Sequence, residues 1–196
     1  MIIPVFPLNG AVLFPKTNLP LNIFEKKYLD MVNYSLSNHR LVGMIQHREN
    51  GSLFNIGCYG KITVFNETKD NRYLINLEGV NCYKIISQIK TSHKFRLFKI
   101  QKVENFSSGN IEDSLKPKIL EAYKKYLKLK NINLNLDDIT RLNLDDVLKY
   151  IVMISPFDIN IKQMLLELKT IKELYKNILS IIEMELVPSQ GNITVN

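Results

Sequence analysis

The spacing of apolar residues changes once along this chain of 196 residues, and that change limits the folds open to it. Between residues 40 and 104, short apolar runs are separated by turn-forming residues, which is typical of successive β-strands. In the run that begins at residue 72, Tyr73, Ile75 and Leu77 alternate with polar residues, as in a half-buried antiparallel strand. Similar runs begin at residues 41, 61, 83 and 94. The first half therefore predicts a twisted antiparallel sheet or a β-barrel.

From about residue 111 the apolar period becomes 3.6, which predicts helices near 112–130, 144–154 and 170–186. One further helix is expected in the first half, from Glu25 to about Leu36. The chain is thus predicted to be an α+β protein. The change of period predicts a β-rich subdomain over residues 1–108 and a helical subdomain over 109–196, with residues 188–196 forming a frayed tail.

Turn-forming residues indicate where the strands end. The segments 49–52 and 69–71, read as Glu-Asn-Gly-Ser and Lys-Asp-Asn, predict hairpin turns. Gly57 and Gly60, which precede Lys61, predict a third turn. Their spacing does not match a phosphate-binding loop, and they lead into a strand rather than a helix.

Residues capable of catalysis or metal binding are few and scattered. His39, His47 and His93 are separated along the chain, with no partner in the sequence that would make them ligands or bases. Cys58 and Cys82 lack the CxxC spacing of metal sites, so buried free thiols are expected, with a disulfide between neighbouring strands as the alternative. The sequence predicts a protein that is not an enzyme and has no metal and no cofactor.

The formal net charge of +7 invites a nucleic-acid-binding interpretation. Residues 1–109 hold 14 basic against 7 acidic residues, whereas residues 110–196 hold 12 of each, so the excess lies in the β-rich half. A possible basic patch comprises Lys84, Lys90, Lys94, Arg96, Lys99 and Lys102. The alternative is a solvated face or an edge guarded by lysines. Phe95 and Phe98 are expected on opposite faces of their strand, which leaves no ladder of rings for base stacking.

Three blocks of the sequence carry a family resemblance. The first is FPLNGAVLFP at 6–15 with LPLNIFEKKY at 19–28, and the second is GCYGKI at 57–62 with RYLINLEGVNCYKI at 72–85. The third is SPFDINIKQMLLELKTIKELYKNIL at 155–179. Together they resemble the N-terminal, substrate-binding domain of Lon proteases. Lys26 and Lys27 depart from the Pro and Arg frequent in that family, and a lysine cannot replace the bidentate guanidinium.

The resemblance implies a PUA-like β-barrel followed by a helical bundle, in a stand-alone form without the ATPase and peptidase domains. It implies binding of unfolded or tagged polypeptides, with a separate Lon-type protease as a possible partner. Nucleic-acid (RNA) binding by the basic β half is the second hypothesis. No apolar stretch approaches the roughly 20 residues that cross a bilayer, and the N-terminus lacks a secretory signal, so a cytoplasmic protein without membrane association is expected.

The predicted peptide site is an apolar edge that consists of Leu19, Pro20, Leu21 and Phe24. Proline restricts this segment next to a helix start, and low conformational freedom favours the docking of an extended peptide. The alternative is that Ile23 and Phe24 face inward as part of the core. Leu21 is accordingly expected to be more exposed than Phe24.

Overall fold

The computed structural model describes residues 1–106 and 111–187. All six strands of the described chain precede Val103, and one helix lies among them. The strands and this helix are β1 (Ile2–Pro7), β2 (Asn18–Ile23), α1 (Lys26–Leu36), β3 (Leu41–Ile45), β4 (Ile56–Glu67), β5 (Tyr73–Ile89) and β6 (Arg96–Lys102). The predicted boundary near residue 108 and the predicted tail over 188–196 lie outside the described residues.

Helices account for the regular structure after residue 111. A 3-10 turn (Asp113–Leu115) leads into α2 (Lys116–Leu129), which is followed by α3 (Asp137–Thr140), α4 (Leu144–Ile154), α5 (Ile159–Leu166) and α6 (Ile171–Leu186). The helix predicted at 144–154 is confirmed at both ends, and Asn143 caps its start by accepting from the Asp146 N–H. The helix predicted at 170–186 is confirmed too, with Thr170 and Glu173 forming a capping box. The short helices α3 and α5 were not expected.

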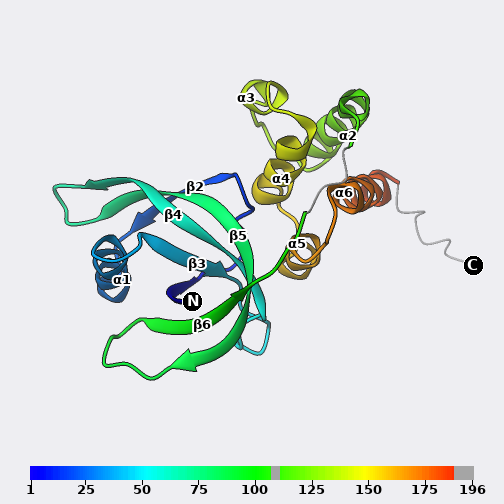
Figure 1. Cartoon of the computed structure of the whole chain (residues 1–196). Coiled ribbons are helices and arrows are strands. Elements are labelled where there is room, and N and C mark those ends of the chain that lie inside the picture. The colour runs from blue at the N-terminus through cyan, green and yellow to red at the C-terminus, as the bar shows by residue number, and fades with distance from the viewer. Residues whose placement is uncertain (107–110, 188–196) are drawn as a thin grey trace, which may run out of the picture.

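The strands form a six-stranded sheet in the order β2-β5-β4-β3-β1-β6. An additional β5–β6 pairing joins five of the strands into a ring and leaves β2 paired with β5 alone. Figure 1 shows this curved sheet on one side of the molecule and α2–α6 on the other. The antiparallel pairing expected between residues 40 and 104 is confirmed for β3, β4, β5 and β6, whereas β1, which was not expected, pairs in parallel with β3. The chain between these two strands passes through β2 and α1, which supplies the long connection that parallel strands require.

Two of the sequence-based strand boundaries need correction. The runs that begin at residues 72 and 83 belong to one strand of 17 residues, β5. The turn predicted at Gly57 and Gly60 is also wrong, because both residues lie within β4. Glycine is required there for close approach, since a Cβ on Gly57 would lie 2.2 Å from the Met44 carbonyl oxygen. The turn predicted at 69–71 is confirmed, with Asn71 at a φ of 60°.

The main hydrophobic cluster runs through both halves of the chain. It includes buried residues of the strands and loops, such as Leu13 and Phe14, and buried residues of α2, α4 and α6. A second, smaller cluster around Tyr59, Tyr83 and Phe98 lies against the loop that contains Phe54. The sheet is therefore packed on both faces, and the helices share a continuous core with one of them.

Candidate functional site

The residues of the predicted apolar edge do not form one surface. In β2, Leu19 and Leu21 are partly buried and pack against the main core, whereas Pro20 between them is exposed. Phe24, the residue after β2, is 66% exposed. The expectation that Phe24 faces inward and that Leu21 is the more exposed residue is therefore wrong, although Ile23 is buried as expected. The physical reason is the two-residue period of a strand, which directs Ile23 and its neighbour to opposite sides.

The outer edge of β2 offers little to a pairing strand. The Asn18 N–H donates to the hydroxyl of Tyr150 at 3.2 Å, so it points away from β5, which is the one strand within residues 1–106 and 111–187 that pairs with β2. By alternation the nitrogens of Pro20 and Asn22 point the same way, and proline has no hydrogen to donate. A proline on an edge strand is a common device against strand addition. Proline therefore removes one backbone donor from this edge of the sheet.

Aromatic side chains lie near the tip of the β4–β5 hairpin, beside the end of β2. Phe24 and Phe65 are exposed, whereas Tyr73 is partly buried against the main core. Phe65 and Tyr73 pack edge to face with ring centroids 4.9 Å apart. The guanidinium carbon of Arg72 lies 6.0 Å from the centre of the Phe24 ring, and Tyr73 is in register with Ile23, the residue before Phe24. Phe65 is in register with Ile75, so the rings of Tyr73 and Phe65 both lie on the face opposite Phe24. We call Phe24 and Arg72 the hairpin aromatic surface.

The turn between the two strands is held by its own hydrogen bonds. The Thr68 N–H donates to the Arg72 carbonyl at 2.9 Å, and the Arg72 N–H donates to the Thr68 hydroxyl at 3.1 Å. Arg72 also pairs with Asp70, with 2.8 Å between Nε and Oδ2. The hydrogen bond from the Thr68 hydroxyl, with a smaller contribution from the Arg72 charge, lowers the pKa of Asp70. The hairpin therefore presents Arg72 and the adjacent rings from a well-ordered turn.

The predicted basic patch is divided between two faces of its hairpin. Lys84 is in register with Gln101, so it shares a face with Lys99, while Arg96 and Lys102 alternate onto the other face of β6. Lys90 and Lys94 lie in the connection between β5 and β6. Phe95 belongs to the main core and Phe98 to the second cluster, which confirms that they face opposite ways. Both rings are buried, so neither is available for base stacking.

A hollow of about 680 Å³ lies between α1 and the β5–β6 connection. The His93 ring stacks on Phe95 with 4.7 Å between centroids, and the Tyr34 ring packs against both of them. Lys26 and Lys94 also line the hollow. Nothing in the sequence pattern predicted this cluster, because it depends on how α1 packs beside the hairpin.

The cysteines and acidic residues give no reactive group. Cys58 and Cys82 are directly opposite each other on β4 and β5, and both are buried free thiols, as expected. Burial, and then a hydrogen bond with Cys82, raises the pKa of the Cys58 thiol, so the nucleophilic thiolate is disfavoured. Within residues 1–106 and 111–187, no group of three or more histidine, cysteine, aspartate or glutamate side chains could hold a metal ion.

The lysine and glutamine of the third sequence block bridge the two halves of the chain. The Lys162 ammonium donates to the carbonyls of Gly10, at 2.7 Å, and Met153, at 3.2 Å, and burial lowers its pKa. The Gln163 amide donates to the Ile56 carbonyl at 2.9 Å. Gln46 Nε2 donates to Gln163 Oε1 at 3.2 Å. These side chains have a structural role, because they fix α5 against the sheet.

Comparisons with known proteins point to one family. The sequence model described as the ATP-dependent protease La (LON) substrate-binding domain matches residues 2–184. A Lon protease from Buchnera aphidicola subsp. Acyrthosiphon pisum is 25% identical over 94% of this chain, and one from Desulfosudis oleivorans is 24% identical over 65% of it. The matched parts cover only 25% and 16% of those proteins. The chain thus spans about a quarter or less of the length of these relatives.

Solved structures share the fold. A Lon N-terminal domain protein from Xanthomonas campestris superposes with a TM-score of 0.68 at 18% identity, covering 92% of this chain and 98% of that structure. The N-terminal domain of a Mycobacterium avium complex Lon protease gives a TM-score of 0.66 at 14% identity, covering 93% and 98%. Among the residues described, none of the helices combines the length and apolar character needed to cross a membrane.

Proposed function

Because the chain belongs to the family of Lon substrate-binding domains, we propose that it is a noncatalytic module that binds unfolded polypeptides. A Lon-type protease that receives the bound polypeptide is the proposed partner, and the cytoplasm is the proposed location. The PUA-like character of the β-barrel and the bundle arrangement of α2–α6 belong to the same proposal. Support comes from the family match over residues 2–184 and from the shared fold.

The exposure of Phe24 is the observation that carries the choice of site. An aromatic ring that is 66% exposed and lies beside a guanidinium is unusual away from an interface, since aromatic residues and arginine are enriched where proteins bind each other. The Phe65 ring, which is 37% exposed, lies near the tip of the same hairpin. An unfolded chain exposes apolar side chains that such rings can cover, and this contact needs no particular sequence.

The expected size of the effect follows from the ring area. A buried Phe removes roughly 200 Å² from water, so covering the exposed two-thirds of Phe24 buries roughly 130 Å². At about 25 cal/mol per Å², this gives an upper limit of about 3 kcal/mol. Ordering the bound chain offsets part of that gain. We expect Phe24→Ala to weaken binding by about tenfold.

The test measures the affinity of a labelled, reduced and carbamidomethylated polypeptide by fluorescence anisotropy. Met184→Ala is the matched control, because Met184 is 72% exposed and lies on α6, far along the chain from the hairpin. Circular dichroism establishes that both variants are folded. Equal affinities for Phe24→Ala and Met184→Ala would remove the hairpin aromatic surface from the proposal.

The arrangement of the basic residues does not support the nucleic-acid hypothesis. The same binding test distinguishes this hypothesis from polypeptide binding. Counterion release makes binding to a polyanion fall steeply with salt, whereas apolar burial is little affected by moderate ionic strength. A Lys94/Arg96/Lys99 triple alanine variant should therefore keep its affinity for the unfolded polypeptide. Loss of binding in that variant alone, together with loss of wild-type binding at high salt, would contradict the proposal.

A further inference from the structure

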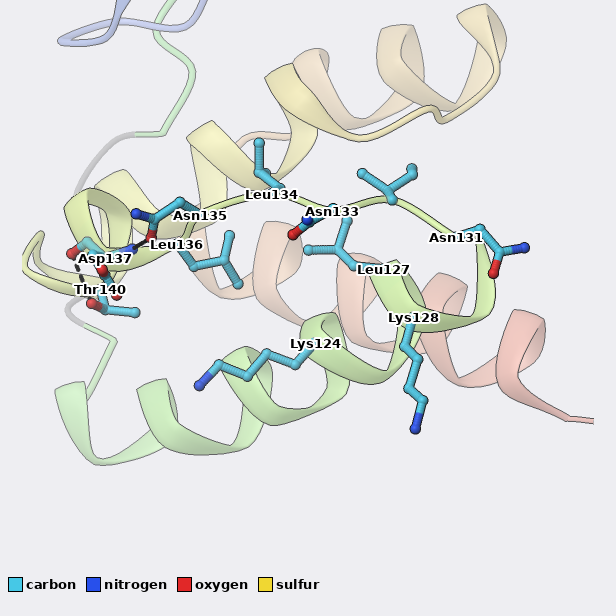
Figure 2. Close-up of a pocket in the computed structure, with 11 residues that line it drawn as sticks. Lys124, Leu127, Lys128, Asn131, Asn133, Leu134, Asn135, Leu136, Asp137 and Thr140 are labelled. Carbon is cyan, nitrogen blue, oxygen red and sulfur yellow. Dashed lines mark hydrogen bonds between the residues drawn. The ribbon is translucent and has the colours of Figure 1, made fainter.

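A groove in the helical half runs between α2 and the segment 131–137. It has a volume of about 540 Å³ and is lined on the α2 side by Lys124, Leu127 and Lys128. Figure 2 shows the segment alongside α2, with Leu127 between the two. The far end of the groove is closed by Asp137 and Thr140, where α3 begins.

The segment is irregular, and part of its backbone is free to pair. It reads Asn-Ile-Asn-Leu-Asn-Leu over 131–136 and has no helix or strand assignment after the turn at Asn131. The Ile132 N–H donates to the Leu127 carbonyl at 2.9 Å, which ties the start of the segment to α2. Beyond it, the backbone groups of Asn133, Leu134 and Asn135 make no hydrogen bond with any described residue. Three consecutive unpaired peptide groups form a short template for strand addition.

The α2 wall carries two lysines without acidic partners. Lys125 pairs with Glu121 and Lys130 with Glu185, but Lys124 and Lys128 have no carboxylate within 4 Å in the described parts of the chain. Residues four apart on a helix have Cβ atoms roughly 5–6 Å apart. Alternate side chains on one face of an extended strand are separated by roughly 6.6 Å. The Cβ atoms of Lys124 and Lys128 are therefore spaced much like two acidic side chains that flank a single residue, and the flexible lysine side chains can reach such a pair.

From these features we propose that the groove binds an extended acidic peptide segment in which two carboxylates alternate with an apolar residue. The peptide backbone pairs with residues 133–135, and its carboxylates face Lys124 and Lys128. Asp137 is the acidic residue of the lining, and it repels carboxylates from the α3 end of the groove. This site is separate from the hairpin aromatic surface, so the outcome of its test does not depend on the function proposed above.

The probe is a fluorescein-labelled peptide in which aspartate and glutamate alternate with valine, and anisotropy gives its affinity for the full chain. Two exposed charge pairs together change an affinity by about two- to thirtyfold. We expect a loss in that range for the Lys124→Gln/Lys128→Gln variant. We also expect a similar loss for a peptide with asparagine and glutamine at the acidic positions.

Two controls separate groove binding from general attraction to positive charge. Lys172 and Lys176 on α6 are also exposed and four residues apart, and they line a different hollow together with Glu112. The Lys172→Gln/Lys176→Gln variant should bind the acidic peptide as the wild type does. A peptide with N-methylated backbone groups should bind weakly, because it cannot pair with residues 133–135.

Hydrogen exchange gives a readout that does not depend on affinity. The amides of Asn133, Leu134 and Asn135 should exchange more slowly when the acidic peptide is bound. The proposal is overturned if the wild type does not bind the peptide, if the α6 variant loses as much affinity as the α2 variant, or if the N-methylated peptide binds equally well. Phe24→Ala should leave acidic-peptide binding unchanged, which keeps this test distinct from that of the hairpin surface.

Discussion

Replacing Gln163 by leucine should destabilise the protein, because Gln163 is a buried polar bridge between α5 and the sheet. The Ile56 carbonyl that accepts from it points away from β5, since the neighbouring Asn55 carbonyl already accepts from the Ile85 N–H. Leucine has a similar volume but no donor, so the change leaves this carbonyl without the Gln163 hydrogen bond. It also removes one of two acceptors of Gln46 Nε2, which keeps its bond to the Ile159 carbonyl.

The magnitude follows from the cost of an unsatisfied group. A buried carbonyl without a partner costs about 1–3 kcal/mol, and the loss of the bond from Gln46 adds a smaller amount. We expect the free energy of unfolding to fall by about 2–3 kcal/mol. For a chain of this length, that corresponds to a decrease in Tm of roughly 4–12 °C.

The assay is thermal unfolding followed by circular dichroism, with urea titration as a second measure. Met164→Leu is the matched control, because Met164 is the next residue on α5 and is 43% exposed. Its effect should stay within about 0.5 kcal/mol. Gln46→Leu should cost less than Gln163→Leu, since Gln46 Oε1 already has no hydrogen-bond partner among the described residues. A Tm for Gln163→Leu equal to that of Met164→Leu would refute the claim that the Gln163 hydrogen bonds stabilise the protein.

Two further predictions concern the sheet. Gly57→Ala should lower the free energy of unfolding by more than about 3 kcal/mol, or prevent folding, because the new Cβ would lie 2.2 Å from the Met44 carbonyl oxygen; near-native unfolding by urea would contradict this. Cys58 and Cys82 should react with a thiol reagent only as fast as the protein opens, because both are buried and burial raises the pKa of Cys58. Labelling with 5,5′-dithiobis(2-nitrobenzoic acid) tests this, and rapid reaction in native buffer would show that the thiols are accessible.

Local sequence patterns predicted the elements whose residues carry a complete signal. α4 has an asparagine cap and aspartates in its first turn, and α6 has a capping box, so their starts were readable. α5 was missed because its eight residues provide barely two turns of apolar periodicity. The parallel β1–β3 pair and the β5–β6 pairing that closes the ring depend on contacts between distant segments. The spacing of apolar residues within one segment does not indicate such contacts.

The residues of the candidate site were likewise predicted only in part from the sequence. Phe24 was identified, but its direction was predicted wrongly, because Ile23 and Phe24 were assigned to one face although a strand alternates. Phe65 and Tyr73 were missed, although the predicted turn at 69–71 carried the signal for them. A hairpin closed by that turn sets the register of its strands and brings the two rings together. The cluster of Tyr34, His93 and Phe95 had no such signal, since it joins a helix to a distant connection.

Site-specific photocrosslinking tests the central claim most directly. A photoreactive benzoylphenylalanine replaces Phe24 in one variant and Met184 in another, and each is irradiated with a labelled, permanently unfolded polypeptide at low and at high salt. We predict a strong crosslinked product from position 24 at both salt concentrations, because burial of apolar surface is little weakened by moderate ionic strength, and little product from position 184. Equal crosslinking at the two positions, or a product at position 24 that disappears at high salt, would contradict polypeptide binding by the hairpin aromatic surface.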